Sequence, residues 1–391
     1  MENLAPNTLK VAIVGVGMGG CVYVSKLNTQ NYPVEKIYID TNAFDLTDFN
    51  DGKTLALLGP TGQGTGWNPE KGEIAAKDQA ETIANLLGDA KFVIIVAALG
   101  RGTGSGAVPV IARVARERKM LVAAFVTQPF NQEGSNVCEV ARTAYSQLKI
   151  ECHFLLQLEC EKLSLLEQQS SAAEMYEIPR KWIDYGTQRI LTLLFSQDKN
   201  VRLDFSEFCS IFPVAGTRTL LAVGEGEGEN ASAEAISRLY NCPLADYYGK
   251  CDTAVIILTL ATAPTNDLLT EIVEGVRNKF GCKKQLCWRF EVVPEMATKM
   301  RICVLGAGEI EAAKLRRSRV VTPADAQNAS DELALNRDYT GQEGLGVDDR
   351  GIFEGSRQRI YKGVDLEVPT FWRLSINLEK TQKNAKANLK K

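Results

Sequence analysis

The sequence predicts an α/β protein with a doubly wound, mostly parallel sheet, a smaller α+β domain after it, and a disordered C-terminal tail. Between residues 10 and 158, short runs of Val, Ile, Leu and Ala alternate with helical segments, and runs of this kind are typical of strands buried on both faces. A long helical stretch then leads to a second group of strand-like runs. From about residue 309 the chain is polar, charged and poor in aromatic residues, so it cannot bury enough apolar surface to order itself.

The strand-like runs of the first domain are short and rich in β-formers. They cover residues 10–15, 36–40, 92–99, 121–126 and 152–158. Before the last of them, residues 134–149 place Val137, Ala141 and Leu148 on one helical face, which predicts a helix that covers the sheet. Strands that alternate with helices in this way form a parallel sheet with helices on its faces.

The second half of the chain has a different organisation. Residues 179–196 place Ile183, Ile190 and Leu194 on one stripe, which predicts a long central helix that joins two domains. Further strand-like or helical runs follow at residues 254–261, 265–280, 287–293 and 301–308. We therefore expect three parts: an α/β domain with the central helix over 1–207, an α+β domain over 208–310, and the tail over 311–391.

Composition excludes several classes of protein. Of the 391 residues, 45% are hydrophobic and 24% charged, as in an ordinary globular protein, and the net charge of −3 gives no overall attraction to nucleic acid. No secretory signal and no apolar run long enough to span a membrane is recognised. The ten cysteines include no CxxC pair and His153 is the only histidine, which excludes a histidine-rich zinc site. We expect a cytoplasmic protein.

A glycine-rich loop follows the first predicted strand. In "VAIVGVGMGG", Gly15, Gly17 and Gly20 have the spacing of a dinucleotide-binding fingerprint, and Gly19 lies among them. Asp40 follows about 20 residues later, where the ribose-binding acid of an NAD site is expected. A lone fingerprint is a weak signal, so an NAD-binding enzyme is only one alternative.

Further glycine-rich loops argue against NAD. The stretch "GRGTGSG" follows another predicted strand and opens a helix, with small residues at Gly100, Gly102, Thr103, Gly104, Ser105 and Gly106. Backbone N–H groups at such helix starts bind phosphate. The loop "GQGTGWNPEKG" adds Gly64 and Gly66, and "VTQPFNQEG" adds Glu133. A dehydrogenase needs no second phosphate cradle, whereas a nucleoside di- or triphosphate has several phosphates to surround.

These loops, in this order, resemble those of the tubulin/FtsZ superfamily, and most of all its bacterial cell-division branch. "GRGTGSG" is similar to the family signature GGGTGTG, and "VRLDFSEF" is similar to its catalytic loop NxDFxD. The resemblance extends over nearly the whole chain. It implies a tubulin/FtsZ-like fold, GTP or GDP with Mg²⁺ as cofactors, and a filament-forming GTPase of cell division.

The resemblance also implies that two subunits share the work. The first domain of one subunit would hold the nucleotide, and Asp204 and Glu207 of the next subunit in a head-to-tail filament would orient the attacking water. Phosphoryl transfer needs positioning and charge stabilisation, so no histidine is required. By themselves, two acids at i and i+3 are typical of a solvated helix face, and the catalytic role rests on the resemblance.

The C-terminal stretch "DLEVPTFWR" is similar to the partner-binding peptide of the family. The resemblance assigns Asp365, Pro369, Phe371 and Trp372 to the binding of a membrane-tethering adaptor. We therefore expect a protein that reaches the division site through a partner, with no membrane span of its own.

Several positions depart from the family pattern. The asparagine and aspartate that read the guanine base fall at Cys160 and Trp182, and Asp184 is the nearest acid that could replace the aspartate. Arg101 occupies a glycine position, where it could add positive charge near phosphates or fill the cradle. The alternatives are a GTPase with altered base contacts, a homologue with weak or no hydrolysis that regulates or caps filaments, and a misplaced match over residues 151–185. The sequence does not predict metal ligands.

Overall fold

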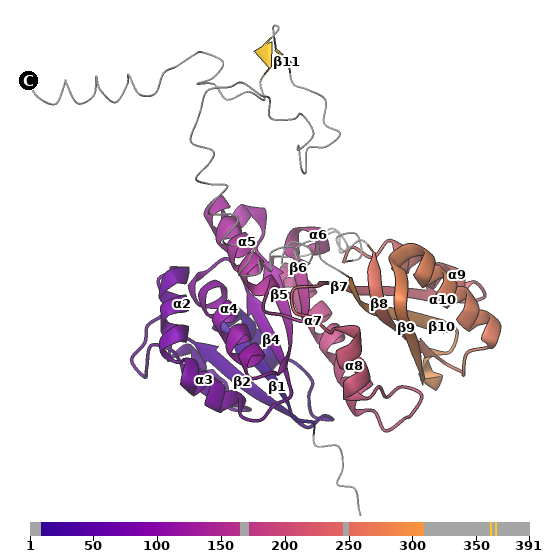
Figure 1. The fold of residues 1–391 in the computed structure, drawn as a ribbon, viewed down its shortest axis with the longest axis horizontal. Helices are drawn as coiled ribbons and strands as arrows, with labels where there is room; N and C mark the ends of the chain where they lie inside the picture. The colour runs from indigo at the N-terminus through magenta and orange to yellow at the C-terminus, as the bar shows by residue number, and fades with distance from the viewer. Residues whose placement is uncertain (1–8, 165–171, 245–249, 309–359, 362–363, 366–391) are drawn as a thin grey trace, which may run out of the picture. The chain divides into compact units, whose positions relative to one another are not determined.

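The computed structural model describes residues 9–164, 172–244, 250–308, 360–361 and 364–365 (Figure 1). The chain divides into two compact units, Met1–Val320 and Val321–Lys391. In the second unit, the described residues form one short antiparallel pair, β11 (Ile360–Tyr361) and β12 (Val364–Asp365). The rest of the predicted tail, including Pro369, Phe371 and Trp372, lies outside the described residues.

The first sheet is parallel throughout and confirms the predicted doubly wound architecture. Its strand order is β3-β2-β1-β4-β5-β6. The strands are β1 (Val11–Val16), β2 (Val34–Asp40), β3 (Lys53–Ala56), β4 (Phe92–Ala98), β5 (Leu121–Gln128) and β6 (Phe154–Glu159). The edge strand β3 was not predicted, because its four residues, KTLA, show no buried apolar run.

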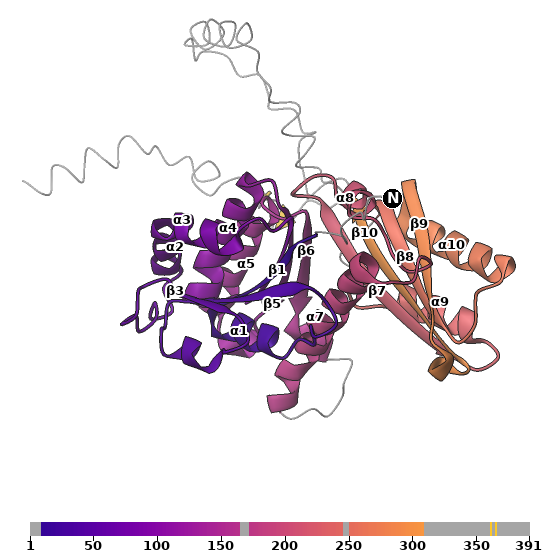
Figure 2. The same cartoon turned by 90° about the horizontal axis from the view of Figure 1, so that it is seen from below.

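Helices cover both faces of this sheet. They are α1 (Gly17–Ser25), α2 (Pro69–Asp78), α3 (Ala80–Leu87), α4 (Gly102–Glu117), α5 (Ser135–Lys149), α6 (Cys160–Ser164) and α7 (Ala172–Phe195). Figure 2 shows α1 and α7 on one side of the sheet and α2 to α5 on the other. Alternate residues of β1 enter separate cores, Val11 and Ile13 on the α1 side and Ala12 and Val14 on the α4 side.

The central helix α7 begins at residue 172, earlier than predicted, and buries Ile183, Ile190 and Leu194. Two short 3₁₀ helices, η1 (Asp45–Asp48) and η2 (Asn131–Glu133), follow β2 and β5. Because the strands are parallel, the loops after β1, β2, β4 and β5 meet at one edge of the sheet, where ligands of such folds bind.

The α+β domain contains a second sheet of order β7-β10-β8-β9, in which β8 and β9 run parallel and the other neighbours antiparallel. Its elements are α8 (Phe205–Ile211), β7 (Arg218–Glu227), α9 (Ala231–Tyr240), β8 (Cys251–Leu260), α10 (Asn266–Phe280), β9 (Gly281–Val292), η3 (Pro294–Met296) and β10 (Lys299–Gly308). Thr219 of β7 accepts a hydrogen bond from the Leu155 N–H at 3.0 Å and donates one to the Leu155 carbonyl at 2.6 Å, which joins the two sheets.

Helices in the described parts of the chain are too short or too polar to cross a membrane.

Candidate nucleotide site

A pocket of about 500 Å³ lies where the loops after β1, β2, β3, β4 and β5 meet. The structure brings together there many of the residues that the sequence assigned to nucleotide binding: Gly17, Gly19, Gly64, Gly66, Gly102, Thr103, Gly104 and Glu133. This volume is in the range of small-molecule sites. The pocket is built from loops that are far apart in the sequence.

Two helix N-termini open on this pocket. Helix α1 begins at Gly17 and α4 at Gly102, and no side chain caps either end. A Cβ added at Gly17 would lie 3.1 Å from the Gly104 N atom, so the two helix starts lie close together. The free N–H groups and the dipoles of two adjacent helices favour an anion at this point.

Other predicted glycines pack the fold and do not line the pocket. A Cβ at Gly15 would lie 2.8 Å from Cys21 Cα, one at Gly20 would lie 2.3 Å from the Val96 carbonyl oxygen, and one at Gly106 would lie 2.0 Å from the Pro69 carbonyl oxygen. These glycines therefore allow α1 to approach the sheet and α2 to approach α4. Their predicted contact with a nucleotide finds no counterpart in the pocket wall.

Gly100 and Ser105 shape the second glycine loop and also lie outside the pocket wall. The Ser105 hydroxyl accepts a hydrogen bond from the Gly100 N–H at 2.8 Å. Gly100 has a φ of +109°, a conformation that L-residues rarely adopt. The pair closes the turn that leads into α4.

One wall carries polar groups close to the helix starts. The Asp40 carboxylate accepts hydrogen bonds from the Thr41 N–H at 2.6 Å and the Thr103 hydroxyl at 3.2 Å. Burial raises the pKa of Asp40, which is only 4% exposed. In the described part of the chain, no cluster of three or more His, Cys, Asp or Glu could hold a metal. Among the described residues, the acids that line the pocket are Asp40, Asp45 and Glu133.

A second part of the pocket wall is formed around Glu133. Its Oε1 accepts hydrogen bonds from the Phe130 N–H at 3.1 Å and the Tyr176 hydroxyl at 3.4 Å. The rings of Phe130 and Tyr176 meet edge to face, 5.5 Å apart. Burial raises the pKa of Tyr176, so its hydroxyl stays protonated and can donate. Tyr176 lines the pocket from the first turns of α7, and sequence reasoning missed it because nothing distinguishes it from other helix residues.

The same wall holds an unsatisfied polar group. Gln128, the last residue of β5, lines the pocket and is 8% exposed, and its Nε2 has no hydrogen-bond partner among the described residues. An unpaired buried donor is costly, and a ligand acceptor would satisfy it. Cys160 also lines this wall, where the base-reading asparagine was placed, and burial raises the pKa of its thiol to about 12. The thiol is therefore neutral.

Asp184 and Trp182 do not line the pocket. Asp184 lies on α7 with its Oδ1 buried and without a hydrogen-bond partner in the described regions, and Trp182 packs against the core beneath the helix. The resemblance placed the base-reading aspartate of the family at Trp182, with Asp184 as the nearest acid that could replace it. The geometry places Tyr176 on the pocket wall instead.

Asp204 and Glu207 also lie outside this pocket. Asp204 is the N-cap of α8, and its N–H donates to Glu207 Oε2 at 3.4 Å. Arg289 of β9 donates to the same oxygen at 3.2 Å and also holds the Arg202 carbonyl at 3.1 Å. The two acids are therefore exposed, joined to each other through Glu207 Oε2, which also accepts a hydrogen bond from Arg289, and separate from the pocket of their own subunit.

Comparisons with known proteins show the family to which the chain belongs. The family model described as "Tubulin/FtsZ family, GTPase domain" matches residues 10–166. "Cell division protein FtsZ 2" of Thermococcus kodakarensis is 30% identical over 286 residues, which covers 70% of this chain and 68% of that protein. The chain belongs to the tubulin/FtsZ family. "Cell division protein FtsZ 1" of the same organism is 28% identical over 76% of this chain and 80% of its own length.

Solved structures support the tubulin/FtsZ fold. The structure titled "FtsZ dimer, empty (M. jannaschii)" is similar with a TM-score of 0.69 at 24% identity, over 78% of this chain and 90% of that one. A CetZ2 structure from Haloferax volcanii, titled a GTPgS-bound protofilament, has a TM-score of 0.61 at 18% identity, over 83% of this chain and 100% of that one. The matched family model is that of a GTPase domain, which agrees with a phosphate site at the two helix N-termini.

Proposed function

We propose that this protein binds GTP and GDP with Mg²⁺, assembles head to tail into filaments, and hydrolyses GTP at the contact between subunits, in cell division or a related cytoskeletal role. The observation that carries the proposal is the separation of two groups on a tubulin/FtsZ fold. The N-termini of α1 and α4 open on the pocket, and the acids Asp204 and Glu207 lie outside it. Two incomplete halves of a site become complete when one subunit meets the next.

A contact between two different surfaces of the same chain is heterologous. Such a contact propagates into an open filament whenever its rotation does not close a ring. The partner in assembly is therefore a second copy of this chain. Loss of the nucleotide changes one of the two joined surfaces, which couples assembly to hydrolysis.

The side chains available to recognise the base favour a second candidate function. The part of the pocket wall around Glu133, which we call the base end, includes the neutral side chains of Gln128, Cys160 and Tyr176. Glu133 itself already accepts hydrogen bonds from the Phe130 N–H and the Tyr176 hydroxyl. A homologue with weak or no hydrolysis that regulates or caps filaments fits such altered contacts. The NAD alternative is disfavoured, because the second glycine loop surrounds more phosphate than a dehydrogenase requires.

Equilibrium binding of the purified protein decides among these functions. We expect GTP and GDP to bind with Mg²⁺ at micromolar concentrations and NAD not to bind. GTP, but not GDP, should make the protein sediment as filaments. Sedimentation that is unaffected by any nucleotide, together with binding to another filament-forming protein, would support the regulatory role instead. Tight NAD binding would contradict both.

The aromatic residues near the C-terminus give a separate prediction. We propose that Phe371 and Trp372 anchor the chain to a membrane-tethering adaptor, since a short segment with two aromatic residues can dock into a partner's groove. Changing both to alanine should abolish localisation at the division site while GTP-dependent assembly in vitro stays within about two-fold, because the pocket, Asp204 and Glu207 are left unaltered. Fluorescence microscopy of the tagged variant measures this. Normal localisation would refute the anchor.

A further inference from the structure

The described residues of the pocket wall include a single positively charged side chain. Among the described residues that line the pocket, Arg101 is the only lysine, arginine or histidine, whereas Asp40, Asp45 and Glu133 are acids. A phosphate chain brings further negative charge, and the partial charges of helix N-termini offset only part of it. Arg101 is therefore the one side chain of the described wall that can form an ion pair with a phosphate.

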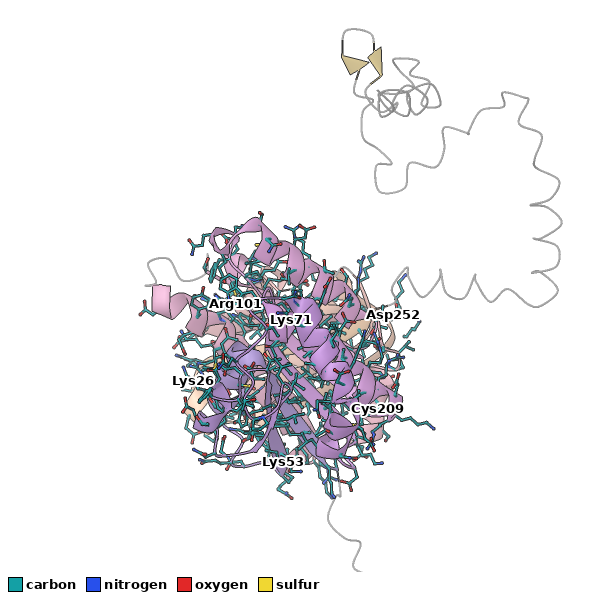
Figure 3. All side chains as sticks on the ribbon, turned by 90° about the vertical axis from the view of Figure 1, so that its left-hand side faces the viewer. Lys26, Lys53, Lys71, Arg101, Cys209 and Asp252 are labelled. Atoms are coloured by element: carbon teal, nitrogen blue, oxygen red, sulfur yellow. The ribbon has the colours of Figure 1, made fainter. Side chains whose placement is uncertain are left out.

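Arg101 reaches across the pocket between three loops. Its guanidinium carbon lies 4.7 Å from the centroid of the Trp67 ring, and its Nη2 lies 3.7 Å from Glu133 Oε2. The arginine side chain remains 59% exposed. Figure 3 shows Arg101 on the same face of the protein as Lys71. An ion pair this long and this exposed is weak, and so is an exposed cation–π contact.

A phosphate group is a stronger partner than these two. The planar guanidinium donates parallel hydrogen bonds to phosphate oxygens, whereas its contact with Glu133 is a single long one. When the arginine leaves, Glu133 keeps the hydrogen bonds from the Phe130 N–H and the Tyr176 hydroxyl. The Glu133 carboxylate therefore still accepts hydrogen bonds after Arg101 moves to a phosphate.

Trp67 is held in an unusual conformation beside the arginine. Its φ is +67°, in the left-handed region, and its side chain is 62% exposed. A large exposed ring in this region is retained only where the surroundings hold it, and such outliers cluster at ligand sites. Here the ring stacks with the guanidinium at the pocket wall.

We propose that Arg101 is a latch that the phosphate chain of a nucleotide releases. In the free protein the guanidinium lies against Trp67 and pairs with Glu133, and in the bound protein it moves onto the phosphates and leaves both. Arg101 is then a specificity-determining residue for polyphosphate. The inference rests on the proposed function, because it takes a nucleoside triphosphate as the ligand.

Tryptophan fluorescence tests the latch. The chain has four tryptophans, so the Trp67 signal is the difference between the full chain and its Trp67→Phe variant. GTP with Mg²⁺ is titrated into the unaltered chain, into Arg101→Gln, and into Lys71→Gln. The last variant is a matched control that removes a charge from an exposed residue outside the pocket.

We expect a saturable change in the Trp67 signal for the unaltered chain and for Lys71→Gln. Arg101→Gln should bind GTP about ten-fold more weakly, the effect of losing a hydrogen bond to a charged group, and should show no such change. Inorganic triphosphate should produce the same change as GTP, and guanosine should produce none.

Other results of the GTP titration would overturn the latch or the proposed function. If the unaltered chain binds GTP and Arg101→Gln matches it in affinity and fluorescence, the latch is overturned and the proposed function stands. Tighter binding by Arg101→Gln also overturns the latch, because the arginine would then fill the cradle. Absence of GTP binding by the unaltered chain overturns the proposed function, and the latch with it.

Discussion

Replacing Asp204 with asparagine should lower GTP turnover at least about a hundred-fold while leaving GTP affinity within about two-fold, because the proposed function assigns orientation of the water to this carboxylate and the change leaves the pocket untouched. Asp204 lies outside the pocket, at the N-cap of α8, so its removal takes no contact from the nucleotide of its own subunit. Steady-state phosphate release and equilibrium binding measure the two quantities. Glu271→Gln, which removes an exposed acid on α10, is the matched control and should change neither.

Mixing variants shows whether the acid acts on a neighbouring subunit. Asp204→Asn keeps its pocket, and Gly66→Val keeps its Asp204 but has an obstructed pocket. If the site is shared, a nucleotide held by the first is reached by the acid of the second, and the mixture should turn over faster than the sum of its components. Turnover per subunit of the unaltered protein should also rise with protein concentration. An additive mixture and a flat concentration dependence would place hydrolysis within one subunit.

Much of the first domain could be predicted from the sequence because its strands are buried on both faces. Such strands, β1 and β4 above all, are continuous apolar runs that need no tertiary information to be recognised. The edge strand β3 could not be predicted, since one neighbour and an exposed face leave its composition almost unconstrained. The glycine loops likewise predicted turns and helix starts after the strands, and several of their residues line the pocket.

The contacts at the base end could not be predicted in the same way. The resemblance pointed to Trp182 and Asp184 on α7, whereas Tyr176, about two turns earlier on that helix, lines the pocket. The sequence pattern does not show which turn of a long helix meets the pocket. The contacts of Arg101 with Trp67 and Glu133 could not be predicted from the sequence either, because these residues belong to separate loops that only the fold brings together.

The glycine signature also does not reveal which glycines serve the ligand and which serve the fold. At Gly104 an added Cβ would lie 2.3 Å from the Ala98 carbonyl oxygen, so a side chain there collides with backbone even without a ligand. Gly66 also lines the pocket, but a Cβ there would have no atom within 4 Å. A substitution at Gly104 therefore tests folding, and one at Gly66 tests binding.

Changing Gly66 to valine should weaken GTP binding at least about a hundred-fold with a modest loss of stability. The isopropyl group enters pocket space that the proposed function assigns to the nucleotide. The left-handed φ of +60° adds strain of about 1–3 kcal/mol, which lowers the melting temperature by several degrees. Gly59→Val is the matched control: its φ is +77°, its Cβ would also have no neighbour within 4 Å, and it does not line the pocket. The Gly59→Val variant should lose similar stability and keep GTP affinity.

Gly104→Val, by contrast, should lower the free energy of unfolding by more than about 4 kcal/mol, as backbone overlap in a packed interior does. Thermal unfolding and GTP binding of the three variants measure both effects. Equal GTP affinity of Gly66→Val and Gly59→Val would show that the nucleotide does not occupy this pocket.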